Sequence, residues 1–244
     1  NPSLDMWVPG DGSDVLVPTF YVLPQAPRTG IVLNLAEKRL YYYPGDPRKV
    51  VTYAISIGRE GWDTPVGSFH IVRKDEDPAW YPPASIRKER ADEGRPPLPA
   101  VVPAGPDNPL GEYALRLSAA GYLIHGTNKP WGLGMEVSHG CIRMYPENIA
   151  ELFPRVSVKT PVTIVDQPYK LGWLGDELYL EVHRKDGDEP GRLEEIVPAE
   201  VAQAPGVSVD WGEVELAVRE NTGLPRLVGG RKSTASWLYL DTIF

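Results

Sequence analysis

The stretch Ser138-His139-Gly140-Cys141-Ile142-Arg143-Met144 contains Cys141, the single cysteine of the 244-residue chain. A second short motif, His125-Gly126-Thr127-Asn128, follows an apolar run and begins sixteen residues before Cys141. A thiolate is the nucleophilic form of cysteine, and a nearby imidazole can stabilise it or remove the thiol proton. The two motifs therefore predict a cysteine nucleophile that works with a histidine base.

Two other interpretations of Cys141 are open on composition. A free cysteine is most often a small buried hydrophobic residue. Cys141 could also bind zinc with His125 and His139, although structural zinc sites usually have four nitrogen or sulfur ligands, often as cysteine pairs. Gly140 favours the nucleophile, because a glycine lets the backbone approach a substrate closely or adopt a turn that other residues avoid. We therefore expect no metal and no other cofactor.

The two motifs together resemble the catalytic signature of the L,D-transpeptidases, the YkuD-like cysteine enzymes of bacterial cell walls. That family has a His-Gly motif, a short gap, and then Ser/Thr-His-Gly-Cys followed by an apolar residue and Arg or Asn. This sequence has each part, with Arg143 in the last position. Thr64–Phe69 also resembles the family's Thr-Pro-x-Gly-x-Phe element. The resemblance implies a mostly β fold, a sandwich or meander of the YkuD type with a few short helices.

The composition limits the function classes. The net charge is −8 and the isoelectric point is about 5.1, which argues against nonspecific binding to nucleic acid. No apolar run reaches the length of about 18 residues that indicates a transmembrane helix. The chain begins at Asn1 without a leader, so the signal peptide of an exported protein would have been removed or left out. In an exported protein, a single unpaired cysteine indicates a reactive thiol.

The strand pattern agrees with a mostly β fold. Residues Gly30–Leu35, Leu40–Tyr43 and Val50–Gly58 predict three strands, and the short turns between them predict an antiparallel meander. Tyr122–His125 is expected to be the strand that delivers His125, and Pro161–Val165 the strand that closes the sheet. The 26 prolines and 24 glycines are also typical of short strands joined by many turns.

Three regions are predicted along the chain. Residues 1–26 resemble the end of a LysM peptidoglycan-binding module or are a plain linker, with a short strand at Val15–Pro18. Residues 27–166 are the catalytic domain. Residues 167–244 resemble a small α+β C-terminal subdomain, in which Asp210 and Glu213 have the spacing of a capping box before a helix.

A proline-rich insertion at 74–112 interrupts the catalytic domain and contains nine prolines. Loops of this length are usually functional lids or disordered linkers, and the aromatic residues here favour a packed loop. Residues Ser85–Glu93 could form one short helix, and we expect the insertion to wall one side of the active cleft. A second helix is predicted over Tyr145–Phe153, which would place Cys141 on a turn just before it.

The resemblance implies the roles of the motif residues. Cys141 attacks a carbonyl and forms a thioester, while His125 accepts the thiol proton and later returns one to the leaving amine. A backbone carbonyl at Gly126 or a neighbour would orient the imidazole. Backbone amides around Gly140 and Cys141 would form an oxyanion hole. His139 is expected to support the cysteine loop rather than act as the base.

The resemblance also implies the substrate. The acyl donor would be a tetrapeptide stem of peptidoglycan, cut after the L-centre of meso-diaminopimelate with release of D-Ala. Arg143 and Lys129 would meet the carboxylates of the donor, although a salt bridge of Arg143 inside the fold is the structural alternative. The remaining residues expected on the substrate side are Ser138, Thr127, Asn128 and Trp131.

The acceptor stays open at this point. Another diaminopimelate gives a 3→3 crosslink, the C-terminal Lys of an outer-membrane lipoprotein gives an anchored protein, and water gives an L,D-carboxypeptidase or another hydrolase. The order of segments most resembles the anchoring branch, which implies the periplasm of a Gram-negative bacterium and acylation by carbapenems. A papain-like or NlpC/P60-like hydrolase is disfavoured because those enzymes place the cysteine before the histidine. A noncatalytic peptidoglycan-binding protein is the other alternative.

Overall fold

The structure is a computed structural model that describes residues 10–12, 14, 16–46, 48–185 and 187–232. The chain divides into two compact units, one over Ala26–Asp166 and the other over Asn1–Gln25 with Gln167–Phe244. The first of these carries both motifs and is called the catalytic unit below. Among the described residues, no helix combines the length and the apolar character needed to cross a membrane.

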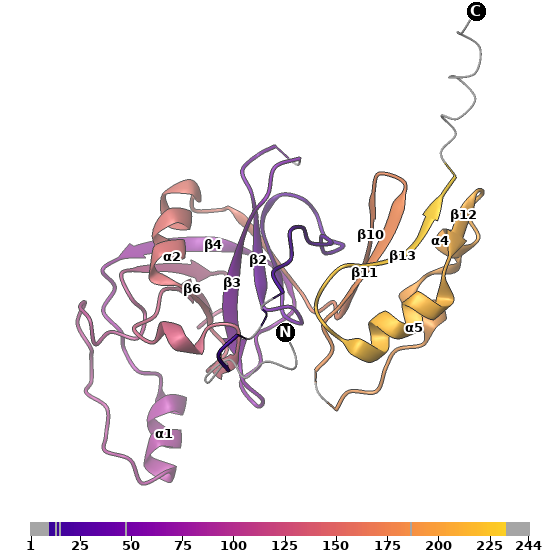
Figure 1. The fold of residues 1–244 in the computed structure, drawn as a ribbon. Coiled ribbons are helices and arrows are strands. Elements are labelled where there is room, and N and C mark those ends of the chain that lie inside the picture. The colour runs from indigo at the N-terminus through magenta and orange to yellow at the C-terminus, as the bar shows by residue number, and fades with distance from the viewer. Residues whose placement is uncertain (1–9, 13, 15, 47, 186, 233–244) are drawn as a thin grey trace, which may run out of the picture. The chain divides into compact units, whose positions relative to one another are not determined.

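The catalytic unit is built on a nine-stranded sheet in the order β2-β1-β9-β4-β5-β6-β8-β3-β7. A further pairing of β2 with β3 closes the sheet into a barrel-like ring (Figure 1). The mostly β fold and the antiparallel β1-β2-β3 meander are therefore confirmed. The strands are β1 (Gly30–Asn34), β2 (Arg39–Tyr43), β3 (Val51–Gly58), β4 (Gly67–Glu76), β5 (Tyr113–Leu117), β6 (Leu123–His125), β7 (Glu136–Ser138), β8 (Ile142–Met144) and β9 (Pro161–Val165).

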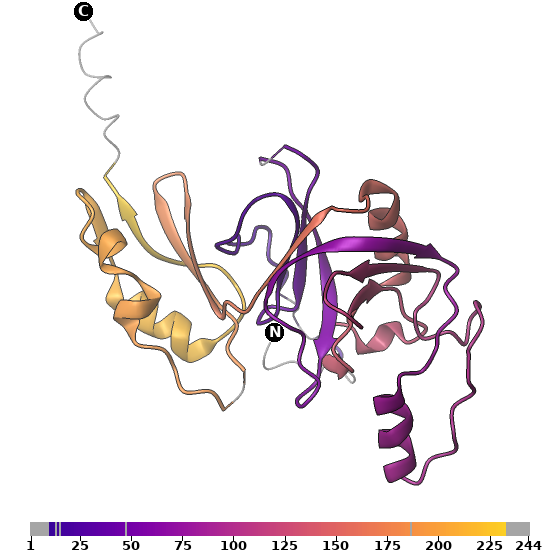
Figure 2. The same cartoon turned by 180° about the vertical axis from the view of Figure 1, so that it is seen from behind.

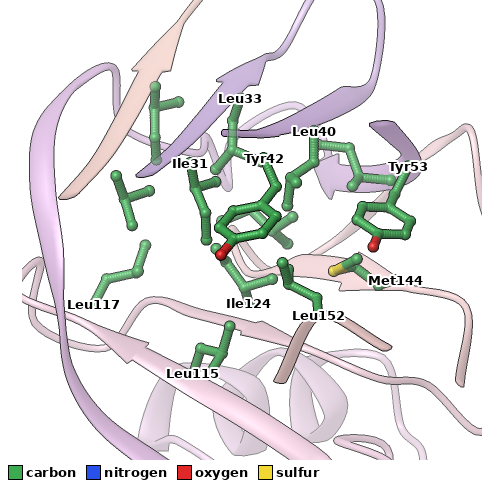
Figure 3. Packing of buried hydrophobic residues seen from close by; sticks show 14 of the residues in the cluster. Ile31, Leu33, Leu40, Tyr42, Tyr53, Leu115, Leu117, Ile124, Met144 and Leu152 are labelled. Atoms are coloured by element: carbon green, nitrogen blue, oxygen red, sulfur yellow. The ribbon is translucent and has the colours of Figure 1, made fainter. Parts of the chain in front are cut away.

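The core of the ring is formed by side chains that alternate inward along the strands (Figure 3). Burial of such aliphatic and aromatic groups contributes roughly 1.5–3 kcal/mol each and is the main force that holds the sheet closed. Tyr42 makes an apolar and a polar contact. Its ring is buried in the core, and its hydroxyl donates to the carbonyl oxygen of Arg155 at 2.7 Å. The labelled members of this core are Ile31, Leu33, Leu40, Tyr42, Tyr53, Leu115, Leu117, Ile124, Met144 and Leu152.

Two short α-helices, α1 (Ala84–Asp92) and α2 (Pro146–Leu152), and two 3₁₀ turns, η1 (Pro130–Gly132) and η2 (Phe153–Arg155), complete this unit. Pro146 begins α2, where a missing N–H costs nothing, and Ile149 and Leu152 are buried against the sheet. The expectation that Cys141 lies on a turn immediately before this helix is wrong. Strand β8 comes between them, because Ile142 and Met144 alternate into the core.

The insertion over residues 74–112 is a structured excursion from the sheet. Strand β4 continues to Glu76, and Trp80 and Val102 pair through two backbone hydrogen bonds of 2.8 Å. Buried Asn108 ties the base of the excursion, with its Nδ2 donating to the carbonyl of Pro78 at 2.6 Å. The helix predicted at Ser85–Glu93 is present as α1 and lies at the far end of the excursion (Figures 1 and 2).

The second unit is a small α+β assembly around a four-stranded sheet in the order β10-β11-β13-β12. Asp210 caps α5, since its carboxylate accepts from the amides of Gly212 and Glu213. The face of α5 that packs on the sheet is the predicted one, with Val214, Ala217 and Val218 buried. The elements are β10 (Tyr169–Leu174), β11 (Glu177–Val182), α3 (Leu193–Ile196), α4 (Ala199–Ala202), β12 (Val207–Val209), α5 (Trp211–Glu220) and β13 (Arg226–Arg231).

The N-terminal segment belongs to this second unit. The amide of Val22 donates to Glu181 Oε2 at 2.7 Å, and Lys170 Nζ donates to the carbonyl of Val22 at the same distance. Lys170 and Glu181 form a fully buried ion pair of 2.8 Å, which needs these extra hydrogen bonds because two desolvated charges are costly. Leu16–Pro18 form no strand, contrary to expectation, and residues 1–9 of the LysM-like segment and Val15 lie outside the described residues.

Candidate active site

Residues from both sequence motifs line one cavity of about 430 Å³ in the catalytic unit. His125, Ser138, His139, Cys141 and Arg143 line it from the sheet side. The insertion supplies much of the opposite wall, as predicted, through a group of mixed side chains that includes Trp80, Tyr81, Pro83, Ile86, Glu89, Arg90, Glu93, Arg95 and Leu98.

Parallel pairing of β6 with β8 brings the two motifs together. Ile124 is opposite Ile142 and His125 is opposite Arg143. Cys141 directly precedes Ile142, the first residue of β8, and so lies beside the strand that carries His125. Neighbouring strands are separated by about 4.8 Å, which is within reach of a thiol and an imidazole. The gap between the motifs in the sequence is the connection that this parallel pair requires.

Burial raises the pKa of the Cys141 thiol, because the apolar surroundings disfavour the thiolate. A hydrogen bond from the backbone amide of Leu123 to the sulfur and the positive charges of Arg143 and Arg116 act in the opposite direction. The sulfur lies 3.7 Å from the carbonyl oxygen of Gly121, to which the thiol donates. Cys141 is therefore a neutral thiol at rest and needs a base during the reaction.

The imidazole of His125 suits that task. Its Nδ1 donates to the carbonyl oxygen of Gly126 at 2.6 Å, which is the orienting backbone contact that the family resemblance implied. Burial, followed by the positive charge of Arg143, lowers the pKa of His125 to about 4, although hydrogen bonds with the carbonyls of Gly126 and Leu110 act in the opposite direction. The ring is consequently neutral, and with the proton on Nδ1 its Nε2 is a free base.

The backbone of the cysteine loop is fixed from several sides. Gly140 has a φ of 94°, and a Cβ at this position would lie 2.8 Å from the ring of Tyr122. Thr64 of the Thr-Pro-x-Gly-x-Phe element donates from Oγ1 to the carbonyl of Gly140 at 2.9 Å and accepts from the amide of Gly58 at 3.0 Å. Ser138 Oγ donates to the carbonyl of Cys141 at 2.5 Å. The loop thus holds Cys141 in one backbone conformation.

His139 is joined to the insertion. Its Nε2 lies 2.6 Å from Glu89 Oε2 of α1 and 3.2 Å from Nη2 of Arg59. Its ring meets the ring of Trp62 edge-on, with the centroids 4.7 Å apart. These contacts fit the expected supporting role rather than that of the base.

The guanidinium of Arg143 forms no hydrogen bond or ion pair with the residues that the structure describes. Its Nε is buried and has no hydrogen bond, and none of the acidic side chains that the structure describes forms an ion pair with it. The alternative of a salt bridge inside the fold therefore finds no support in the described part of the chain. An unpaired, partly buried arginine that lines a cavity beside a nucleophile can receive a carboxylate from a ligand.

The other expected substrate residues lie away from the cavity wall. Thr127 is buried, and its Oγ1 accepts from the amide of Lys129 at 3.0 Å. Asn128 donates to the carbonyl of Asp107 at 3.2 Å. Trp131 stands on η1 with 63% of its surface exposed. Lys129 does line the cavity, whereas the substrate role of these three residues stays a prediction.

The sequence reasoning missed several residues near Cys141. Arg116 lines the cavity and pairs with Asp75 at 2.6 Å. Arg59 and Trp62 contact His139 from the turn before Thr64. The only signal for the latter pair is that Arg59-Glu60-Gly61-Trp62 directly precedes the Thr-Pro-x-Gly-x-Phe element.

Comparisons with known proteins identify relatives of this chain. The model of the YkuD family, the L,D-transpeptidase catalytic domain, matches residues 28–164. Two Escherichia coli K12 proteins are similar over 234 residues: "Probable L,D-transpeptidase ErfK/SrfK" is 41% identical, covering 92% of this chain and 75% of that protein, and "Probable L,D-transpeptidase YbiS" is 40% identical, covering 92% and 76%. The solved L,D-transpeptidase from Mycobacterium smegmatis has a TM-score of 0.42 and 22% identity, covering 56% of this chain and 58% of that chain.

Proposed function

This chain belongs to the L,D-transpeptidases with a YkuD catalytic domain, and from that premise we propose how its residues divide the reaction. The protein is a cysteine transpeptidase that acts on peptidoglycan. Cys141 is the nucleophile and His125 is the general base. The donor is a tetrapeptide stem, and the preferred acceptor is an amine.

One observation carries the assignment of the roles. His125, at the end of β6, and Cys141, just before the parallel strand β8, line the same cavity as Arg143, whose guanidinium has no hydrogen bond or ion pair with a described residue. A neutral imidazole beside a protonated thiol supports general-base catalysis at the moment of attack, rather than a thiolate formed in advance. Such proton transfer typically contributes about 10²–10⁴ in rate.

In the acylation step, Nε2 of His125 takes the thiol proton as Sγ bonds to the carbonyl carbon at the L-centre of diaminopimelate. The negative charge on the carbonyl oxygen is met by backbone amides near Gly140 and Cys141. The bond to the D-Ala nitrogen then breaks, and the imidazolium returns the proton to that nitrogen. The products are a thioester on Cys141 and free D-Ala, with His125 neutral again.

In the transfer step, the acceptor amine attacks the thioester carbonyl and gives a proton to His125. The C–S bond breaks, and the proton passes to the sulfur, which regenerates the thiol. The result is a new amide and an unchanged enzyme. Because His125 is neutral at the start of each step, the same nitrogen serves both.

Arg143 binds a carboxylate of the donor. A buried donor group without a partner costs about 1–3 kcal/mol, and that cost is recovered when a ligand carboxylate accepts from the guanidinium. A guanidinium also offers two parallel N–H groups, which fixes the orientation of a carboxylate as well as binding it. The site thus recognises an acidic stem peptide although the chain as a whole carries a net charge of −8.

The acceptor class follows from the insertion and from the resemblance. An insertion that covers the cavity opposite Cys141 limits access of water to the thioester, which supports an amine acceptor over hydrolysis. The order of insertion and C-terminal subdomain resembles the anchoring branch, so the amine we propose is the C-terminal Lys of an outer-membrane lipoprotein, in the periplasm. Diaminopimelate as acceptor, giving a 3→3 crosslink, is the second candidate.

The decisive experiment incubates the protein with tetrapeptide muropeptides, with and without a Lys-ended peptide, and reads the products by mass. We expect release of D-Ala, an acyl adduct on Cys141 and a muropeptide joined to the Lys side chain. Tripeptide alone would show a carboxypeptidase, and a crosslinked dimer would show diaminopimelate as acceptor. Undiminished product with Cys141→Ala would refute the mechanism. A carbapenem adduct on Cys141 gives an independent check of its reactivity.

A further inference from the structure

Glu89 connects the insertion to the catalytic loop. Its Oε2 lies 2.6 Å from Nε2 of His139, two residues before Cys141, and its Oε1 forms an ion pair with Nη2 of Arg59. Glu89 and His139 both line the cavity. Glu89 comes from the middle of α1, fifty residues before His139 in the chain.

Arg59 and His139 converge on that one carboxylate. A guanidinium can only donate and a carboxylate can only accept, so Nε2 of His139 donates to Glu89 when it carries the proton. The contact with His139, followed by the charge of Arg59, holds the pKa of Glu89 below its ordinary value. Trp62 packs against the His139 ring and fixes its orientation. A guanidinium and an imidazole N–H that are both directed at one carboxylate beside a nucleophile make a receptor for a carboxylate.

Helix α1 has little else that holds it in place. None of its residues is buried. Its other side-chain bonds stay within the insertion, such as those of Arg87 to Pro82 and Ala100 and of Arg90 to Pro96. Among the described residues, Glu89 makes the hydrogen bonds and ion pairs that join α1 to groups outside the insertion. Partly exposed ion pairs are weak, so a competing carboxylate can displace this one.

We propose that Arg59 and His139 form a carboxylate subsite of the transpeptidase cavity, that Glu89 fills this subsite in the substrate-free protein, and that a carboxylate of the donor replaces Glu89 as α1 moves aside. The inference rests on the proposed function and adds a specificity role for Arg59, which the sequence motifs do not include. Arg143 and the Arg59–His139 pair then form two separate cationic sites around Cys141.

The ligand group is a free carboxylate on a D-configured carbon. The proposed donor has two near the scissile bond, one on the terminal D-Ala and one on the side chain of diaminopimelate. Both carboxylates have the same chemistry. Two donors, each with one of the two carboxylates converted to an amide, distinguish which carboxylate occupies the subsite. The donor amidated at the group that occupies the subsite loses the contact, whereas the other donor keeps it.

The test uses the full chain and four variants: Glu89→Gln, Arg59→Gln, the double variant, and Asp92→Asn as a matched control. Asp92 is also on α1 and also loses one negative charge, but it pairs with Lys88 in solvent. The KM and kcat for release of D-Ala are measured with the natural donor and with each amidated donor. The rate of alkylation of Cys141 by iodoacetamide, an uncharged reagent, reports access to the thiol without substrate.

Glu89→Gln should accelerate alkylation and lower the KM of the natural donor by about three- to tenfold, because an internal competitor has been removed. In the Glu89→Gln background, Arg59→Gln should raise the KM of the natural donor by about tenfold or more, the loss expected for a charge-assisted hydrogen bond. The same change should leave the KM of one amidated donor within about twofold. Asp92→Asn should behave as the unchanged protein.

A different pattern would overturn the inference. If Arg59 only holds α1 in place through its ion pair with Glu89, Arg59→Gln in the Glu89→Gln background changes no donor's KM, because Glu89→Gln has already removed that ion pair. Equal effects on the natural and both amidated donors would also exclude a carboxylate subsite. Failure of the proposed function is a separate result, namely the absence of an acyl adduct on Cys141 with every donor in the unchanged protein.

Discussion

Thr64 Oγ1 donates to the carbonyl oxygen of Gly140 at 2.9 Å, which couples the Thr-Pro-x-Gly-x-Phe element to the residue before the nucleophile. The same hydroxyl accepts from the amide of Gly58, at the end of β3. Gly58 itself is crowded, since a Cβ there would lie 1.9 Å from the carbonyl of Trp62 and 3.0 Å from Cα of Gly140. One buried hydroxyl thus joins the end of β3 and the Thr64 element to Gly140, which lies 76 residues after Thr64, and this contact sets the position of Cys141.

Thr64→Val should therefore lower both stability and turnover. Valine has a similar shape but leaves the Gly140 carbonyl and the Gly58 amide unpaired, at a cost of about 1–3 kcal/mol. We expect a lower thermal midpoint and a lower kcat for release of D-Ala. Thr64→Ser keeps the hydroxyl and should recover most of both. Equal loss in the two variants would show that the methyl group, not the hydrogen bonds, matters.

The pH dependence of kcat/KM should follow His125. The base must be neutral, so activity is lost as the pH falls through about 4, the value to which burial lowers the pKa of His125. Alkylation of Cys141 should keep rising into the alkaline range, because burial raises the pKa of the thiol. The profile is measured with the donor at low concentration in the absence of acceptor. An acid limb between about 6 and 7, the range of an ordinary histidine, would contradict a desolvated, neutral His125.

Gly140→Ala should reduce activity more than the backbone strain alone explains. The φ of 94° and the 2.8 Å approach to Tyr122 both oppose a Cβ. Gly134→Ala is the matched control, since Gly134 has a φ of 83° with open space around its Cβ position. We expect a loss of about 1–3 kcal/mol in stability from strain in each variant, and a further fall in kcat of at least about tenfold for Gly140→Ala. Similar kcat values in the two would remove the steric argument.

Arg143→Lys should raise the KM of the donor by about tenfold with a smaller change in kcat, because a lysine keeps the charge but loses the two-pronged contact. The retained positive charge should leave the acid limb set by His125 nearly in place. Initial rates over a range of donor concentrations provide the measurement. Unchanged kinetics would favour a structural role for Arg143.

Replacement of residues 84–95 by a short glycine linker tests the insertion as a lid. Helix α1 buries none of its residues, so the thermal midpoint of the protein should stay nearly unchanged. Turnover should fall, and the ratio of hydrolysed to transferred product should rise as water reaches the thioester. Products are quantified by mass in the presence of a Lys-ended peptide. Loss of the folded state would count against a lid and for a structural element.

Much of the fold could be predicted because its signals are local. The β1-β2-β3 meander follows from alternation and turn residues, and the Asp210 cap follows from a side chain that reaches amides two and three residues away. The insertion helix was predicted to within a residue at each end. The catalytic pair could be predicted because a double motif at fixed spacing reflects one parallel strand pair.

Other features lacked a local signal. Strand β8 between Cys141 and α2 is only three residues long and was hidden by the helix signal that follows. The position of Val22 between Lys170 and Glu181 joins residues more than a hundred positions apart. The contact of Glu89 with Arg59 and His139 depends on where the insertion places α1 against the catalytic unit, and no periodic pattern in the sequence predicts that position.

The sequence by itself determined which atoms can react here: one thiol, an imidazole sixteen residues earlier and an arginine two residues later. The tertiary structure alone decided their state, because the protonation of Cys141 and His125 depends on burial, and burial is a property of everything packed around them. It also decided that, among the described residues, Arg143 has no acidic partner while Arg59 and His139 both contact Glu89, because a charge pairs with whichever opposite charge the folded chain brings within reach.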